Sequence, residues 1–308
     1  MRDGHMNTKS LIIGLFLFLF LIVFLFSGVE DFPVLKGPYL GQKPPGMTPE
    51  VFAPGIISTA KNELNSVFSP KGDEFFFSIH TGERYVMMYT RQINGVWTKP
   101  SVFLFSGEYS DVDMALSPDG NTLYFCSNRP SIWEGRQMDV WYCLRTSDGW
   151  SEPQNLGKPV NSAQDETYPW ITANGTMYLA SSRAGGMGDK DLYCAILKNG
   201  KYAEPVHLGE AINSEFGEGD TYIAPDESYL IVGSWGRPDV YGRGDLYISF
   251  KKKDGTWSKI VNMGDTINTS ATEYCPVVSP DGKYFFFTRG GDIFWVDSKI
   301  IESYRPKN

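Results

Sequence analysis

A short hairpin unit recurs five times in this chain and constrains its fold more than any other feature. In its clearest copy, residues 277–287, an apolar run, a Ser-Pro-Asp-Gly turn and an aromatic run follow one another. Proline fixes φ early in the turn and glycine accepts the positive φ at its end, so the two runs become antiparallel strands. The equivalent turn positions are spaced 48, 55, 52 and 55 residues apart, a period typical of β-propeller blades. These positions are Pro70, Pro118, Ala173, Pro225 and Pro280.

Each hairpin is followed by two further strand signals. The third strand opens with an acid such as Asp139, and the fourth opens with an aromatic residue such as Trp150 after an Asp-Gly or Asn-Gly turn. The fifth repeat lacks its fourth strand, but residues 48–59 align without a gap on 151–162. The sequence therefore predicts an all-β fold over residues 47–308. This is a five-bladed propeller of four-stranded antiparallel blades, closed into a ring by an N-terminal strand.

The N-terminus predicts export. Residues 11–29 carry no charge and follow Arg2 and Lys9, so residues 1–29 are interpreted as a signal or anchor segment. The apolar run is between a signal peptide and a full membrane span in length, and its poor cleavage site favours an uncleaved anchor over a cleaved signal. Residues 30–46 are rich in Gly and Pro and are interpreted as a tether. We expect a periplasmic, cell-envelope or extracellular propeller, in contact with the membrane through its N-terminal segment.

Charge and cysteine content exclude several functions. A net charge of −8 argues against binding of a nucleic-acid backbone, which needs clustered Lys and Arg. The four cysteines lack the Cys-x-x-Cys spacing of a zinc site and are expected to be small buried residues. Cys126 and Cys143 fall on adjacent predicted strands, so a disulfide between them is the alternative.

The repeat resembles a known family. The second copy is nearest to the pattern, with Ser117 to Gly120, Arg129, Asp139, Trp150 and Pro153 in the family positions. It is similar to the WD-like β-propeller repeat of TolB and of exported Bacteroidetes-type envelope proteins, and the resemblance covers the chain after the tether. It implies a propeller fold and an exported location. Because the family contains both scaffolds and binding modules, the resemblance implies little about function.

Charged residues recur at fixed places in the repeats. An acid stands seven residues before each turn position. Two residues after each acid, on the same side of the strand and deeper in the channel, stands a second set of side chains. Four second strands end in arginine. We expect a carboxylate ring at one mouth of the channel, able to bind a hard cation such as Ca²⁺, a polyol or an amine. The alternative is a structural belt in which each acid pairs with the arginine of a neighbouring blade. The acids are Glu63, Asp111, Glu166, Glu218 and Glu273; the deeper residues are Asn65, Asp113, Tyr168, Asp220 and Cys275; the arginines are Arg129, Arg183, Arg237 and Arg289.

Aromatic residues on the loops between second and third strands complete the predicted ligand-binding set. Trp133, Trp235 and Tyr241 lie on the longest of these loops or beside them. Exposed rings above a polar mouth suit stacking against a sugar or contact with a peptide. Alternatively, Trp133 and Trp235 pack the loops onto the sheets.

These features favour a binding module over an enzyme. Catalysis needs one asymmetric constellation, whereas most candidate groups here recur in every repeat, and no Gly-x-Ser-x-Gly motif or catalytic triad is present. We expect an exported, non-catalytic propeller that binds a protein partner or glycan on its channel-mouth face. The alternative is a glycoside-processing enzyme with Asp113 and Asp220 as acid and base, together with Glu166 or Glu218. A purely structural role in an envelope assembly is the third hypothesis.

Overall fold

The computed structural model describes residues 32–306 apart from residues 134 and 136. The chain divides into two compact units, 1–33 and 34–308, and the second contains every strand found in the described residues. The predicted signal or anchor segment, 1–29, lies outside the described residues. No helix in the described part of the chain is both long enough and apolar enough to cross a membrane.

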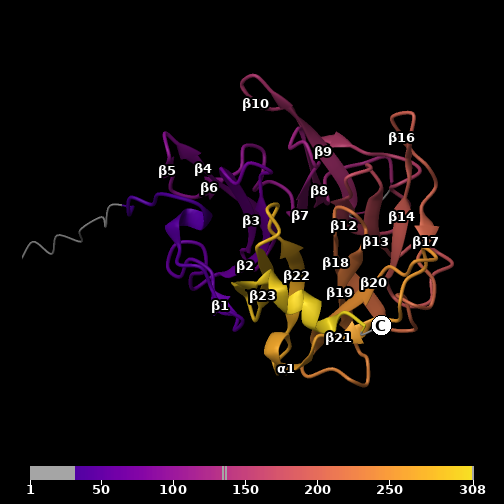
Figure 1. Cartoon of the computed structure of the whole chain (residues 1–308). Helices are drawn as coiled ribbons and strands as arrows, with labels where there is room; N and C mark the ends of the chain where they lie inside the picture. The colour runs from indigo at the N-terminus through magenta and orange to yellow at the C-terminus, as the bar shows by residue number, and fades with distance from the viewer. Residues whose placement is uncertain (1–31, 134, 136, 307–308) are drawn as a thin grey trace, which may run out of the picture. The chain divides into compact units, whose positions relative to one another are not determined.

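The second unit is a five-bladed β-propeller, as predicted. The first strands of the five blades surround a common axis, and each contacts the first strands on both sides (Figure 1). Blade 1 contains β2 (Asn62–Phe68), β3 (Glu74–His80), β4 (Tyr85–Ile93), β5 (Val96–Trp97) and β6 (Ser101–Val102). Blade 2 contains β7 (Asp111–Leu116), β8 (Thr122–Ser127), β9 (Asp139–Thr146), β10 (Gly149–Trp150) and β11 (Gln154–Asn155). Blade 3 contains β12 (Glu166–Ile171), β13 (Met177–Ser181), β14 (Asp191–Ala195) and β17 (Val206–His207), with a side hairpin of β15 (Leu197–Lys198) and β16 (Lys201–Tyr202).

The last two blades follow the same plan. Blade 4 contains β18 (Gly217–Ile223), β19 (Tyr229–Trp235), β20 (Gly244–Phe250) and β21 (Val261–Asn262). Blade 5 contains β22 (Glu273–Val278), β23 (Tyr284–Arg289), β24 (Asp292–Asp297) and, from the other end of the chain, β1 (Glu50–Val51). The helices are short: η1 (Tyr39–Gly41), α1 (Gly264–Ile267) and η2 (Ser298–Tyr304).

Strand β1 closes the ring in the predicted place. Glu50 is opposite Trp295 in an antiparallel pair, and the Phe52 amide donates to the Ile293 carbonyl oxygen at 2.8 Å. The Phe52 side chain is fully buried against aromatic rings of both blade 5 and blade 1. The N-terminal peptide therefore joins the last blade to the first. These rings belong to Phe68, Phe75, Phe286 and Trp295.

The hydrophobic core is divided among the seams between blades. Five of its clusters each join two adjacent blades, so no blade buries its faces alone. Part of the expected tether also belongs to this core: Leu40 is fully buried, and Tyr39 packs edge-on against Phe68 and Tyr284. The four cysteines are free, so the alternative of a disulfide between Cys126 and Cys143 is not realised.

Candidate functional site

The five acids that begin the first strands are fully buried and hydrogen-bonded within the fold. Glu218 shows the arrangement. Its Oε2 accepts the Ser214 amide at 2.9 Å, and its Oε1 accepts the hydroxyls of Ser214 at 2.7 Å and Ser234 at 3.0 Å. Glu63, Glu166 and Glu273 hold the Ser or Thr four residues earlier in the same way. These four carboxylates therefore fix the chain as it enters blades 1, 3, 4 and 5.

Each of the four arginines pairs with the acid of its own blade. The structural alternative predicted pairs between neighbouring blades, so this part of it is wrong. Arg237 Nη2 lies 2.7 Å from Glu218 Oε1, and Arg289 Nε lies 3.0 Å from Glu273 Oε1. The start of the first strand and the end of the second are antiparallel partners, which places the two charges side by side within one sheet. The remaining pairs are Arg129 with Asp111 and Arg183 with Glu166.

Each arginine also reaches the connection from the preceding blade. Their guanidinium groups donate to the carbonyl oxygens of Phe105, Val160, Ile212 and Ile267. Burial raises the pKa of Asp111 and Glu166, and arginine and hydroxyl donors oppose that rise. The geometry favours the structural alternative for this ring, because the carboxylates are buried and engaged within the protein.

The structural role of the ring gives a testable expectation. Glu218→Gln keeps the shape of the side chain but replaces one charge-assisted acceptor, so we expect a loss of about 2 kcal/mol in the free energy of unfolding. Denaturant melts would measure it. Glu204→Gln, an exposed position in the same chain, is the matched control. An unchanged midpoint for Glu218→Gln would contradict the structural role.

The deeper set of residues forms a separate cluster on the axis. All five have positive φ, and each lies where the register of the first two strands shifts, which marks a β-bulge. Asn65 Oδ1 accepts the Asp113 amide at 3.2 Å, and Asp220 Oδ2 accepts the Cys275 amide at 3.1 Å. The Tyr168 hydroxyl lies 3.8 Å from Cys275 Sγ. The bulges therefore turn one polar side chain from each blade into contacts with other blades.

Asp113 and Asp220 are the two titratable carboxyls of this cluster. Their exposed fractions are 4% and 3%. Burial, together with the charge of Asp220, raises the pKa of Asp113 to about 7, and Lys190 opposes the rise. Burial raises the pKa of Asp220 to about 6. Asp113 Oδ1 has no hydrogen-bond partner among the described residues. The pair named as acid and base is thus almost fully buried on the axis.

The sequence predicts a cation site at the mouth of the channel, among the ring of acids. Within residues 32–306, apart from residues 134 and 136, no group of three or more His, Cys, Asp or Glu side chains is arranged to hold a metal ion. Binding of Ca²⁺ stays a prediction from the sequence.

The three predicted loop aromatics differ in their exposure. Tyr241 is exposed, and Trp133 is half-buried beneath Lys158, whose Nζ lies 4.7 Å from the centroid of the indole ring. Trp235 lies flat on its own sheet, where glycines make room for it: a Cβ on Gly244 would be 2.3 Å from the Trp235 Nε1 atom. Trp235 therefore packs its blade, as the structural alternative held.

The loops between the second and third strands lie on one face of the propeller, which we call the loop face. A polar groove lies on this face between blades 1 and 2. Its volume is about 660 Å³. Arg84 in its wall donates to the carbonyl oxygens of Gly107 and Glu108 at 2.9 and 3.0 Å. Aromatic and polar side chains line it together, including Glu83, Arg84, Tyr109, Asn128 and Trp133.

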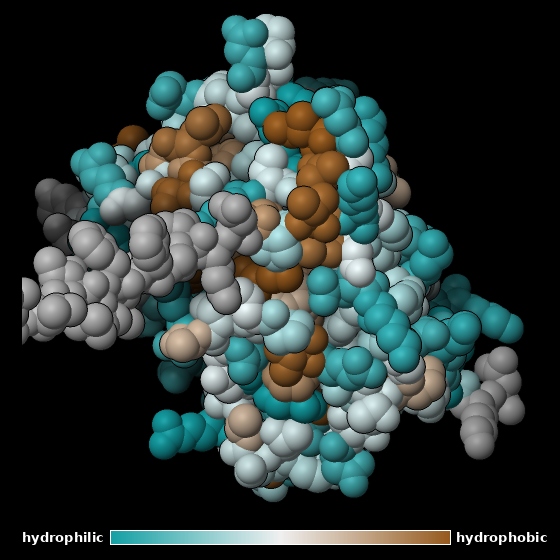
Figure 2. Space-filling model, turned by 90° about the vertical axis from the view of Figure 1, so that its left-hand side faces the viewer, coloured by the Kyte–Doolittle hydropathy of each residue, from teal (hydrophilic) through white to brown (hydrophobic). Residues whose placement is uncertain are grey.

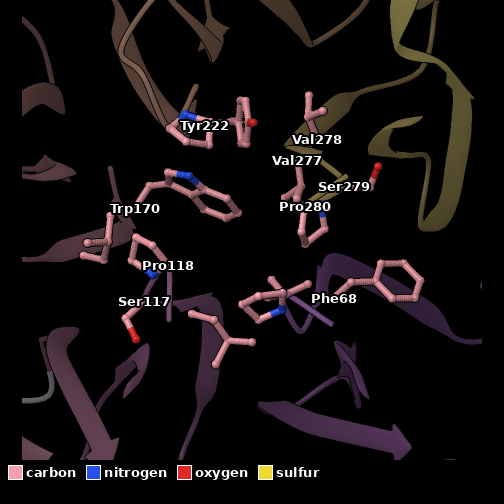
Figure 3. A pocket seen from close by; sticks show the side chains of 14 residues that line it. Phe68, Ser117, Pro118, Trp170, Tyr222, Val277, Val278, Ser279 and Pro280 are labelled. Carbon is pink, nitrogen blue, oxygen red and sulfur yellow. The ribbon is translucent and has the colours of Figure 1, made fainter. Parts of the chain in front are cut away.

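Sequence reasoning missed an apolar cavity at the opposite end of the axis. This face, which we call the turn face, carries the turns that follow the first strands. The cavity, which we call the cup, has a volume of about 280 Å³ and is lined by residues of all five blades (Figure 3). The rings of Trp170 and Tyr222 form one wall, with centroids 5.0 Å apart. The other lining residues include Pro70, Leu116, Pro118, Pro225, Val277 and Pro280.

The cup is lined by uncharged side chains and continues into three grooves. The two serines in its lining are engaged within their own turns: Ser117 donates to Asp119 at 2.5 Å and Ser279 to Asp281 at 2.8 Å. Pro70 and Pro280 together line a groove of about 330 Å³ between blades 5 and 1. Pro70 also lines a groove of about 330 Å³ between blades 1 and 2, and Pro280 lines one of about 380 Å³ between blades 4 and 5. The same turns that identified the fold thus shape this surface, although the sequence pattern indicated only their role as connections.

Comparisons with known proteins support the fold. Neither a known family model nor a curated protein sequence matches this chain. Among solved structures it is similar to TolB from Acinetobacter baumannii, at 15% identity and a TM-score of 0.51 over 79% of this chain and 56% of that one. It is also similar to a glycoside hydrolase (13% identity, TM-score 0.56, 89% of this chain and 93% of that one). A third similar structure is a BT0996 RGII complex (11% identity, TM-score 0.54, 85% of this chain and 91% of that one).

These similarities concern architecture. At such identities a shared propeller fold carries no function with it, and the three structures differ in what they are called. The chain spans little more than half the length of the TolB that it matches. TolB-like propellers are therefore structural neighbours of this protein.

Proposed function

We propose that this protein is an exported, non-catalytic binding module that binds an extended segment of a protein partner across its turn face. The cup carries the proposal, because five blades build one preformed apolar cavity on the axis. Its walls combine proline rings and packed aromatic rings with Val, Ile and Leu side chains. The prolines and packed rings lose little side-chain freedom when a ligand enters. A cavity of about 280 Å³ is near the lower limit of ligand pockets and suits one large apolar side chain.

The grooves suggest the chemistry around that anchor. Between blades 5 and 1, Asp73 and Asp281 share a groove with Lys71. Between blades 4 and 5, Asp226 and Glu302 share a groove with Lys299. The hydrogen bond from Ser228 lowers the pKa of Asp226. Burial acts to raise the pKa of Asp281, but hydrogen bonds from Tyr39, Lys283 and Ser279 outweigh it and lower that pKa, so both carboxyls are anionic at neutral pH. An aromatic side chain next to basic residues would complement the uncharged cup and the acids of these two grooves.

A fluorescein-labelled peptide with a Lys-Trp-Lys centre tests the proposal by fluorescence polarisation. Leu116→Trp should fill the cup and weaken binding at least tenfold, whereas Leu144→Trp, at an exposed position on β9, should not change it. A second variant, Asp226→Asn with Glu302→Gln, leaves the cup intact and should weaken binding and its salt dependence. Equal binding of a Lys-Ala-Lys peptide, or binding unaffected by Leu116→Trp, would contradict the proposal.

Glycan binding in the polar groove of the loop face is the second candidate. The observation that favours it is the combination of Tyr109 and Trp133 with polar side chains in one groove. Tyr109→Ala should then reduce retention on an oligosaccharide array while peptide binding at the cup is unchanged. Cleavage of an oligosaccharide, lost in Asp220→Asn, would instead support the glycoside-processing alternative.

A further inference from the structure

The outer edge of blade 1 exposes apolar side chains. Leu104 is 74% exposed and Val102 on β6 is 53% exposed, and Ile93 at the end of β4 is also exposed. Figure 2 views the molecule from the side on which β4, β5 and β6 lie in Figure 1, and it shows an apolar band bordered by hydrophilic side chains. The chain enters the propeller at this edge: exposed Val34 is followed by Leu35, whose carbonyl oxygen accepts the Trp97 amide at 2.9 Å.

The charge of this edge is opposite to that of the protein. The chain carries a net charge of −8, yet residues 85–104 contain Arg91 and Lys99 and no acid. Both cations are exposed, as is Lys36, which bridges to Val96 of β5. Glu74, opposite Arg91 in the sheet, is bound by Arg145 and Tyr89. The corresponding edges of the other blades each present an exposed acid, namely Glu152, Glu204, Asp254 and Glu50.

We propose that the outer edge of blade 1 rests on an anionic lipid surface. Apolar side chains bordered by Lys and Arg, without acids, are the combination that binds at the headgroup region of such a surface. The edges of blades 3 and 4 also carry exposed lysines, but each of the four other edges adds an exposed acid, which weakens the attraction to such a surface. The position of the edge in the sequence agrees with this partner, since the uncharged segment 11–29 ends five residues before Val34. The apolar side chains of this edge do not line the cup, so the two proposals stand or fall independently.

Site-directed fluorescence on the full chain tests the proposal. An environment-sensitive NBD label is placed at Val102→Cys on blade 1 or at Val206→Cys on blade 3, two positions with similar exposure, 53% and 58%. Labelling of the unsubstituted chain gives the background from its native cysteines. With vesicles of phosphatidylcholine and phosphatidylglycerol, we expect a blue shift and quenching by spin-labelled lipid at Val102→Cys and neither at Val206→Cys.

A charge reversal completes the test. Arg91→Glu with Lys99→Glu should abolish the quenching at Val102→Cys, whereas Lys198→Glu with Lys201→Glu on blade 3 should leave it unchanged. The far-ultraviolet circular dichroism spectrum and the melting temperature serve as the folding control for both pairs. Equal quenching at both labels, no quenching at Val102→Cys, or quenching that survives the reversal on blade 1 would each overturn the proposal.

Discussion

Phe52→Ala is expected to lower the free energy of unfolding by about 4 kcal/mol and the melting temperature by roughly 10 °C. Phe52 is fully buried where blade 5 meets blade 1, and its ring contacts those of Phe75 and Trp295. Removing it leaves a cavity at the one seam that is closed by a strand from the far end of the chain. Differential scanning calorimetry would measure the change.

The control for this variant is another phenylalanine. Phe216 lies on the connection between blades 3 and 4 and is only partly buried, so Phe216→Ala should cost much less. Similar losses in the two variants would mean that the seam at β1 has no special part in stability. A larger effect at Phe52 is what its full burial at the closing seam predicts.

The wild-type protein is expected to lose about 2 to 3 kcal/mol more stability than Asp113→Asn between about pH 5 and about pH 8. The folded-state pKa of Asp113 is raised from 3.8 to about 7 by burial and by the charge of Asp220. The folded state therefore holds this proton more tightly than the unfolded chain. The stability contributed by Asp113 is complete below about pH 4 and is lost as the pH rises towards 7. Urea melts at several pH values would measure it.

Other groups also titrate, so the comparison must be between variants. Asp220, Tyr168 and Lys190 face Asp113 and are present in both proteins. Asp148→Asn, at an exposed turn position, should retain the pH dependence of the wild type. Parallel pH profiles for the wild type and Asp113→Asn would show that Asp113 does not keep its proton in the folded state.

The residues that recur in every repeat indicate the architecture of the propeller more than its function. The acid at the start of each first strand recurs because each blade must fix its entering chain, and Glu218 does so through its contacts with Ser214 and Arg237. The positions that differ between repeats, such as Asp113 and Asp220, lie on the axis instead. Asymmetric chemistry therefore exists in this propeller, but beneath its surface.

The sequence by itself determined the number of blades, the order of strands and the closure by β1. These features depend on local turn chemistry and on alternation along each strand, which act over a few residues and repeat five times. The Ser-Pro-Asp-Gly turns at Pro118 and Pro280, for example, are sufficient to place the hairpins of blades 2 and 5.

Only the tertiary structure decided which surfaces are available for binding. The partners of a side chain depend on register and on packing between strands distant in the sequence. Arg237 therefore pairs inside its own blade, and the bulge at Asp113 turns a carboxyl towards the axis. The cup likewise exists only because turns about fifty residues apart meet around one axis. No single repeat therefore predicts its volume or its lack of charge.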